Sequence, residues 1–138
     1  MNDIDSANPL MKLVVSDSQE IDRQKLANLL APYVFFDSAS KEVKFKDAFF
    51  QLKTNADRLE IILLADKARA LIFPDHNEGV TQTDVLNVQA MPEGSVKTTI
   101  KTLFDGRKIL KNKEGKYYVP GYRLPELFSK YKKGVNNE

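Results

Sequence analysis

The chain has 138 residues, 42% of them hydrophobic, and a formal net charge of +2, which provides enough apolar material for one compact domain or for two small subdomains that share a core. It contains no cysteine and one histidine, His76, and this excludes disulfides, cysteine nucleophiles and a polyhistidine zinc site within one chain. The N-terminal residues are acidic where a signal peptide needs basic ones, and their apolar run is too short to span a bilayer. We therefore expect a cytoplasmic protein without a membrane partner.

The charge is distributed unevenly along the chain. Residues 1–90 carry 10 Lys/Arg against 14 Asp/Glu, whereas residues 91–138 carry 11 against 5. A basic half of this kind is expected of a surface that binds a polyanion, and a solubilising tail without a partner has the same composition. Charge alone leaves both interpretations open.

The first predicted helix covers residues 19–31, with Ser16 or Ser18 as its N-cap and Pro32 as its stop. Its apolar stripe consists of Ile21, Leu26, Leu29 and Leu30. This spacing predicts one buried face.

A β-hairpin is predicted next. Two runs rich in β-forming residues, 33–36 and 43–45, are separated by the turn-forming residues Asp-Ser-Ala-Ser-Lys-Glu. A short helical turn at residues 47–52 is expected to close this N-terminal unit.

The central helix is predicted over residues 56–73, with Asn55 as its N-cap and Pro74 at its end. Its apolar positions do not keep to one side, as they would in a surface helix, so we expect it to be sandwiched between other elements. It would then join the N-terminal unit to the C-terminal half in one shared core. A buried strand at residues 61–65 is the competing interpretation, because short apolar runs are ambiguous.

Two further helices are predicted after a turn-rich break. A short helix, 82–90, begins at Thr81 or Thr83, and a tight turn at residues 91–94 leads into a helix over 95–105.

A second hairpin follows the helix that Gly106 is expected to end. Its strands are predicted at 108–112 and 116–119, and Gly115 between them can take the positive φ that a short loop requires.

The C-terminal tail is predicted to hold a last helix from Pro125 onward. Its apolar residues recur at helical spacing: Leu124, Leu127, Phe128 and Tyr131. This stripe fits a dimer helix and fits packing on its own domain equally well.

The predicted elements follow one another as helix, helix, tight turn, helix and hairpin, and the last two form the segment GSVKTTIKTLFDGRKILKNKEGKYYVP. This order resembles the winged helix-turn-helix DNA-binding superfamily. The resemblance covers about residues 56–121, and residues 1–55 match no family. It implies an α+β fold in which an N-terminal helix and β-hairpin subdomain, 1–55, shares the central helix with a winged helix-turn-helix domain, followed by a C-terminal helix and basic tail, 122–138.

The helix over residues 95–105 has a core face and an opposite polar face. The core face is formed by Val96, Ile100, Leu103 and Phe104. Opposite it lie Thr98, Lys101, Thr102 and Asp105, with Ser95 and Lys97 at the edges. In the superfamily this helix enters the major groove, so the resemblance implies that Ser95, Lys97, Thr98, Lys101 and Thr102 contact DNA. An ordinary solvated face has the same composition.

The hairpin supplies the second group of candidate residues. Its lysines are Lys108, Lys111, Lys113 and Lys116, and the resemblance implies that they follow the phosphate backbone. Tyr117 and Tyr118 are consecutive in a strand, so one is expected in the core and the other exposed. Tyr118 completes the candidate DNA-binding set, although packing within the hairpin explains it as well.

Catalysis is not expected. His76 lies in a turn-rich loop, the acidic residues Asp57, Glu60 and Asp66 do not converge on one helix face, and the glycines are too scattered for a phosphate-binding loop. We therefore expect no catalytic residue, metal or cofactor.

The expected function is binding of double-stranded DNA, as a transcriptional regulator without enzymatic activity. The alternative is a winged-helix protein-interaction module or a subunit of a larger complex. In either case a homodimer or a protein partner would bind through the N-terminal subdomain or the C-terminal helix.

Overall fold

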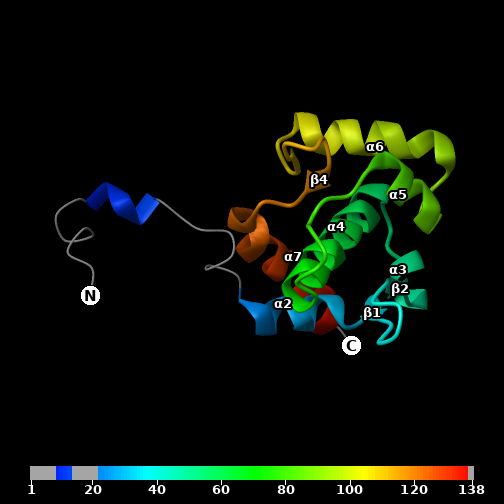
Figure 1. Cartoon of the computed structure of the whole chain (residues 1–138), viewed down its shortest axis with the longest axis horizontal. Helices are drawn as coiled ribbons and strands as arrows, with labels where there is room; N and C mark the ends of the chain where they lie inside the picture. The colour runs from blue at the N-terminus through cyan, green and yellow to red at the C-terminus, as the bar shows by residue number, and fades with distance from the viewer. Residues whose placement is uncertain (1–8, 14–21, 137–138) are drawn as a thin grey trace.

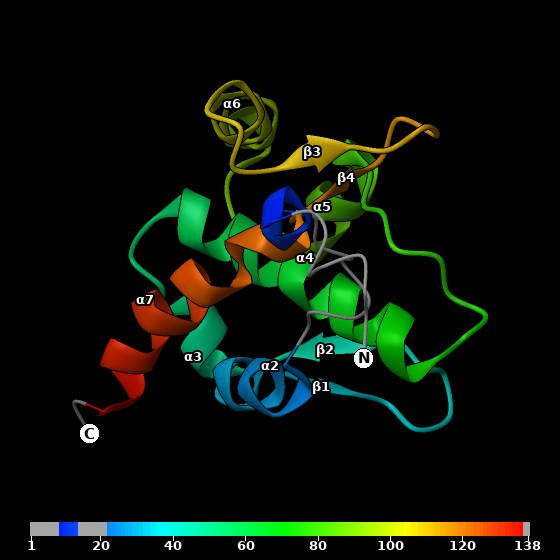
Figure 2. The same ribbon diagram turned by 90° about the vertical axis from the view of Figure 1, so that its left-hand side faces the viewer.

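The computed structural model describes residues 9–13 and 22–136. Within these ranges it contains six α-helices, two short 3₁₀-helices, η1 (Pro9–Leu13) and η2 (Gly121–Arg123), and two antiparallel two-stranded sheets. This mixture of helix and sheet confirms the α+β class (Figures 1 and 2). No helix in the described ranges is both long enough and apolar enough to cross a membrane.

The N-terminal unit begins with α2 (Arg23–Leu30), four residues later than predicted. The start lies here because Asp22 has extended dihedral angles and its carboxylate accepts a hydrogen bond of 3.0 Å from the Lys25 N–H. The predicted N-caps Ser16 and Ser18 lie outside the described residues, as does Ile21.

The predicted hairpin and helical turn are both confirmed. Strands β1 (Val34–Phe36) and β2 (Val43–Phe45) pair antiparallel, and α3 (Asp47–Phe50) follows them.

The central helix α4 (Asn55–Ile72) is sandwiched, as its apolar pattern predicts (Figure 2). It contacts α2 and β2 from the N-terminal unit and α6 (Glu93–Asp105) and β4 (Tyr117–Tyr118) from the C-terminal half. Its buried side chains belong to the same apolar cluster as those of the other helices. The alternative of a strand at residues 61–65 is wrong. The N-cap is Thr54 and not Asn55, because the Thr54 hydroxyl accepts a hydrogen bond of 3.0 Å from the Asp57 N–H.

Helix α5 (Gln82–Val88) begins at Thr81, which forms a capping box with Asp84. Helix α6 begins at Glu93, two residues before the predicted start, because Pro92 already accepts a hydrogen bond of 2.8 Å from the Ser95 N–H. The predicted turn at residues 91–94 is correspondingly shorter.

The C-terminal end of α6 differs from the prediction. Gly106 is the C-cap residue but keeps a right-handed φ of −79°, while Arg107 takes the left-handed conformation with a φ of 62°. The N–H groups of Arg107 and Lys108 then donate to the carbonyls of Phe104 and Leu103, which is the Schellman pattern. Sequence reasoning looked for the glycine that usually adopts the left-handed angle and so placed the motif one residue too early.

The second hairpin pairs β3 (Leu110–Lys111) with β4, over shorter strands than predicted. The strands stop because Asn112 turns the chain: its side-chain oxygen accepts from the N–H groups of Glu114 and Lys116. Gly115 has a φ of 79°, as expected for this loop. Val80, just before α5, forms an antiparallel bridge with Tyr117, so a third segment lies beside the hairpin.

The last helix, α7 (Leu124–Asn136), packs against α2. Leu124, Leu127 and Tyr131 are buried within this chain. The predicted apolar stripe is therefore used for packing on its own domain.

A buried charge network joins α4 to α7. Glu60, 2% exposed, accepts hydrogen bonds from Arg123 at 3.1 Å, from Lys130 at 2.8 Å and from the Tyr131 hydroxyl at 2.9 Å. Burial raises the pKa of the Tyr131 hydroxyl, helped by the Glu60 charge, so it remains a donor. Arg123 also donates to the Lys108 carbonyl at 3.0 Å. The network thus fixes the chain where α6 passes into the hairpin.

Candidate nucleic-acid interface

Helix α6 has one face in the core and one face that no other element of the described residues covers. Val96, Ile100 and Leu103 are buried against α4 and α5. Figures 1 and 2 show α6 at the upper edge of the molecule, with α7 on a different side. The outer side of α6 is therefore open.

The predicted polar residues of α6 lie on this open side. Lys97, Thr98, Lys101 and Thr102 are exposed, and Ser95 is half-buried. Threonine hydroxyls can donate to phosphate oxygens or base edges, and lysine ammonium groups can pair with phosphates or with guanine acceptors.

Lys101 is not a free cation, because it pairs with Asp105 one turn later at 2.9 Å. The hydrogen bond with Asp105 raises the pKa of the Lys101 ammonium. Both side chains are more than half exposed, so water screens the pair and Lys101 can exchange Asp105 for another partner at little cost.

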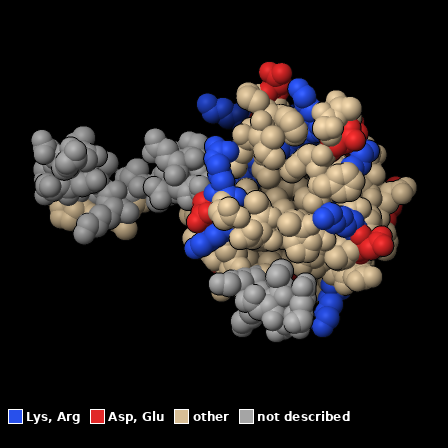
Figure 3. Space-filling view, turned by 90° about the horizontal axis from the view of Figure 1, so that it is seen from below, with Lys and Arg blue, Asp and Glu red and all other residues tan. Residues whose placement is uncertain are grey.

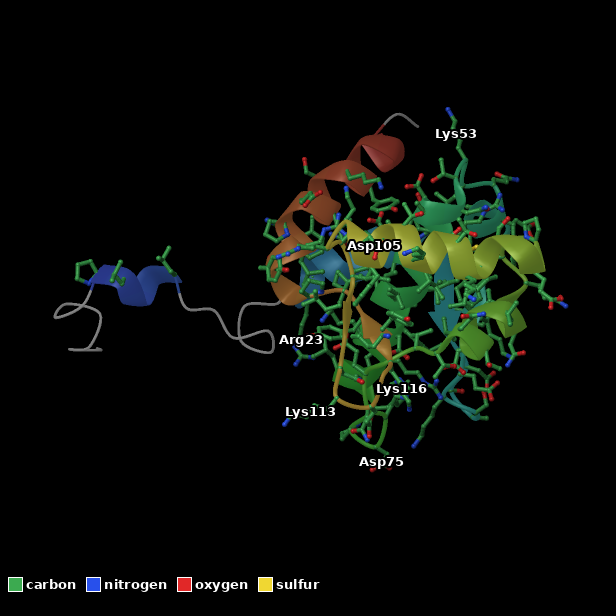
Figure 4. The ribbon with its side chains drawn as sticks, turned by 90° about the horizontal axis from the view of Figure 1, so that it is seen from above. Arg23, Lys53, Asp75, Asp105, Lys113 and Lys116 are labelled. Carbon is green, nitrogen blue, oxygen red and sulfur yellow. The ribbon has the colours of Figure 1, made fainter. Side chains whose placement is uncertain are left out.

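The hairpin adds Lys108, Lys111 and Lys113, all of them exposed. Figure 4 shows Lys113 projecting away from the body of the molecule, whereas Asp105 lies on α6. Because the Asn112 side chain holds the turn and Arg123 holds the Lys108 carbonyl, the lysine backbones are fixed relative to α6.

An aromatic corner joins α6 to the hairpin. Phe104 was predicted in the core, but its side chain is 39% exposed, and its ring meets the Tyr117 ring edge-on at 5.9 Å. The Lys111 ammonium lies 5.3 Å from the Phe104 ring centre and 5.1 Å from that of Tyr117, which is within cation–π range. The core prediction fails because Phe104 lies at the edge of the apolar arc, where the hairpin packs from one side only.

Arg107 is a basic residue that sequence reasoning missed. It is exposed at the corner between α6 and β3. In the sequence it follows Lys101 by six residues and directly precedes Lys108. Its place in the sequence, directly after Gly106 and before Lys108, was the available signal.

Two predicted residues do not join this surface. Lys116 is half-buried and lines a pocket with residues of α4 and α5. Tyr118 is half-buried, and its ring centre lies 5.9 Å from the ammonium of Lys67, which is 1% exposed and belongs to α4. The expectation of one buried and one exposed tyrosine is also wrong, because Tyr117 and Tyr118 are both half-buried against neighbouring elements.

We call the surface that remains the basic face. It consists of Lys97, Thr98, Lys101, Thr102, Arg107, Lys108, Lys111 and Lys113. Residues 93–116 carry seven Lys/Arg against three Asp/Glu. On the opposite side of the molecule, basic and acidic side chains are interspersed wherever described atoms are visible (Figure 3). Even without Lys116, the segment that forms α6 and the hairpin therefore has an excess of positive charge.

Metal binding has no support in the described ranges, where no group of three or more histidine and carboxylate side chains lies close enough to hold an ion. Comparison with protein-family models, with curated proteins and with solved structures finds no match.

Proposed function

We propose that this chain binds double-stranded DNA through the basic face, as a winged helix-turn-helix protein without enzymatic activity that serves in transcriptional regulation. The observation that carries the proposal is the open side of α6 with Lys97, Thr98, Lys101 and Thr102 exposed on it. A basic hairpin leaves the end of this same helix.

The order of the elements supports the winged-helix interpretation. Helix α4, the Val80 segment, α5, α6 and the hairpin follow one another, and Val80 bridges to Tyr117 on the return strand. A small sheet of this kind sits beside the helix that reads DNA in that superfamily, so its lysines and those of α6 would reach the same duplex.

The two parts of the basic face would have different roles. An α-helix is about 10–12 Å across, and the major groove is about 12 Å wide, so α6 fits with its outer side toward the base edges. The N-terminal half of a recognition helix lies nearest the bases, and this criterion assigns sequence reading to Thr98, which lies in that half of α6. Lys113 on the hairpin would neutralise phosphate and carry no sequence information.

Single substitutions test this division of roles in a fluorescence anisotropy assay with a selected duplex and a random duplex. Lys113→Ala should weaken binding to both duplexes by similar factors, whereas Thr98→Ala should cost roughly 1–3 kcal/mol on the selected duplex alone. The control is Arg23→Ala, which removes an exposed charge from α2, across the molecule from α6 (Figure 1). Loss of affinity in Arg23→Ala equal to that in Lys113→Ala would contradict the proposal.

Protein docking through the N-terminal unit is the second candidate function. Phe35 on β1 is 50% exposed and Phe50 on α3 is 44% exposed, and exposed aromatic side chains are enriched at protein interfaces. Replacing both with serine should leave DNA affinity unchanged and abolish association with any partner that binds there.

A further inference from the structure

A pocket lies beside the second hairpin, and no residue of α6 lines it. It has a volume of about 390 Å³ and is bounded by β2, α4, the loop at residues 76–80 and α5. This volume is near the lower end of the range for small-molecule sites, roughly 300–1,000 Å³. Lys116, which does not join the basic face, lies in its wall.

The carboxylates in the pocket wall already have partners within the protein. Asp66 accepts a hydrogen bond of 2.7 Å from the Gly79 N–H with one oxygen and pairs with His76 at 2.7 Å through the other. Asp84 accepts from the Thr81 N–H at 2.9 Å as part of the α5 cap. Each carboxylate therefore already has at least one hydrogen-bond partner within the protein.

Two cations in the same wall lack partners. Throughout residues 22–131, no hydrogen bond or ion pair is formed by the side chain of Arg69 or of Lys116, and both residues are half-buried. Within the same residues, the Nε of Arg69 is buried and has no hydrogen-bond acceptor. A buried donor without an acceptor is unfavourable, since it has lost its water and gained nothing in exchange. The pocket thus has two basic groups available for an anion.

The rest of the wall combines the side-chain amides of Asn77 and Asn87 with a group of apolar side chains. Phe45 from β2, Ile62 from α4 and Val88 from α5 line it together with Val43 and Val80. Binding sites of this composition hold an apolar body and orient it through a few polar groups. An inorganic anion would leave this surface unused.

We propose that the pocket binds a small organic carboxylate, with its apolar body against Phe45, Ile62 and Val88 and its carboxylate between Arg69 and Lys116. A guanidinium can donate two parallel hydrogen bonds to a carboxylate, which suits Arg69 to this role. The occupant would contact the hairpin through Lys116 and α5 through Val88, the two elements that flank α6. This inference goes beyond DNA binding and does not depend on it.

Isothermal titration calorimetry of the full chain without DNA tests the proposal, with benzoate and hexanoate as probes. Benzamide is the uncharged counterpart of benzoate, and inorganic phosphate is an anion without an apolar body. We expect at least one of the two carboxylates to bind with a dissociation constant in the millimolar range or tighter, and benzamide and phosphate to bind at least about tenfold more weakly, because each lacks one of the two interactions.

Substitutions locate the site. Arg69→Gln and Lys116→Gln should each weaken carboxylate binding about tenfold, Arg69→Lys should retain part of it, and Arg23→Gln on α2 should have no effect. Two separate variants guard against loss of folding in either one, and circular dichroism melting confirms that each is folded. Failure of both carboxylates to bind at about 10 mM, equal binding of benzamide, or unchanged affinity in both pocket variants would overturn the proposal. Carboxylate binding by a chain that does not bind DNA would refute the proposed function alone.

Discussion

The buried network around Glu60 gives the most specific prediction for stability. Its carboxylate receives one donor on Oε2, from Arg123, and two on Oε1, from Lys130 and Tyr131. Glu60→Gln keeps the size of the side chain but replaces one oxygen with an NH₂ group and removes the charge. Whichever way the amide turns, its NH₂ group faces at least one of the three donors.

Glu60→Gln should lower the free energy of unfolding by less than a substitution that leaves a buried charge with no partner at all. Removing one partner of a buried pair costs about 3–5 kcal/mol when the other is left alone. Here Arg123 keeps Glu126 at 3.1 Å and the Lys108 carbonyl at 3.0 Å, and Lys130 keeps Asp57 at 2.8 Å. One charge-assisted hydrogen bond is lost and one donor is left facing another, so we expect a loss of about 2–3 kcal/mol in the free energy of unfolding.

Equilibrium unfolding in urea, followed by circular dichroism, measures this loss. The matched control is Glu126→Gln, which removes the other carboxylate that pairs with Arg123 but whose side chain is 61% exposed. We expect the control to cost about 0–1 kcal/mol. If Glu60→Gln costs no more than Glu126→Gln, the argument that burial makes this network important for stability is refuted.

Three further experiments test separate features of the structure. Arg107→Gly should raise the free energy of unfolding by about 0.5–1 kcal/mol, because Arg107 holds a left-handed φ of 62° that glycine adopts without strain, and Arg107→Ala should bring no such gain in the same melts. Asp105→Asn should tighten duplex binding about threefold at low salt, since it releases Lys101 and removes a negative charge beside the basic face; an unchanged affinity would argue against contact of this turn with DNA. The hydrogen bond from Arg123 holds the pKa of the Glu126 carboxyl below its ordinary 4.5. The folded state therefore binds fewer protons at this group than the unfolded state does. The stability that Glu126 contributes is complete above pH 4.5 and is lost as the pH falls through the lowered pKa. Urea midpoints at a series of acidic pH values should therefore fall less steeply in Glu126→Gln than in wild type.

Local sequence signals predicted most of the elements correctly. Pro74 and the apolar residues on several faces predicted a sandwiched central helix, and Gly115 predicted the hairpin turn. These features depend on backbone conformation and on hydrophobic periodicity, which are properties of short segments.

The helix ends and the composition of the site were harder to predict. Thr54 and Asn55 are both good N-cap residues, so only the geometry of the first turn distinguishes them. Glu60 and Lys67 are charged, yet they are only 2% and 1% exposed, because partners from other elements pair with them. Such long-range pairing leaves no periodic signal.

The division of the hairpin lysines between two surfaces was not predictable either. Strand alternation indicates that neighbouring side chains point to opposite sides, but it does not say what each side meets. Lys116 meets the pocket beside α4 and α5, whereas Lys113 projects into solvent. The packing of the hairpin against α4 decides this, and it depends on the whole fold.

The salt dependence of duplex binding tests the central claim most directly. Six Lys/Arg side chains belong to the basic face, and if four to six of them contact phosphates, the logarithm of the association constant should fall with the logarithm of salt concentration with a slope of about −4 to −5. The triple variant Lys108→Ala/Lys111→Ala/Lys113→Ala should have a slope shallower by about 2–3, and Arg23→Ala should keep the wild-type slope. Absence of binding at low salt, or a slope that the triple variant leaves unchanged, would contradict DNA binding through the basic face.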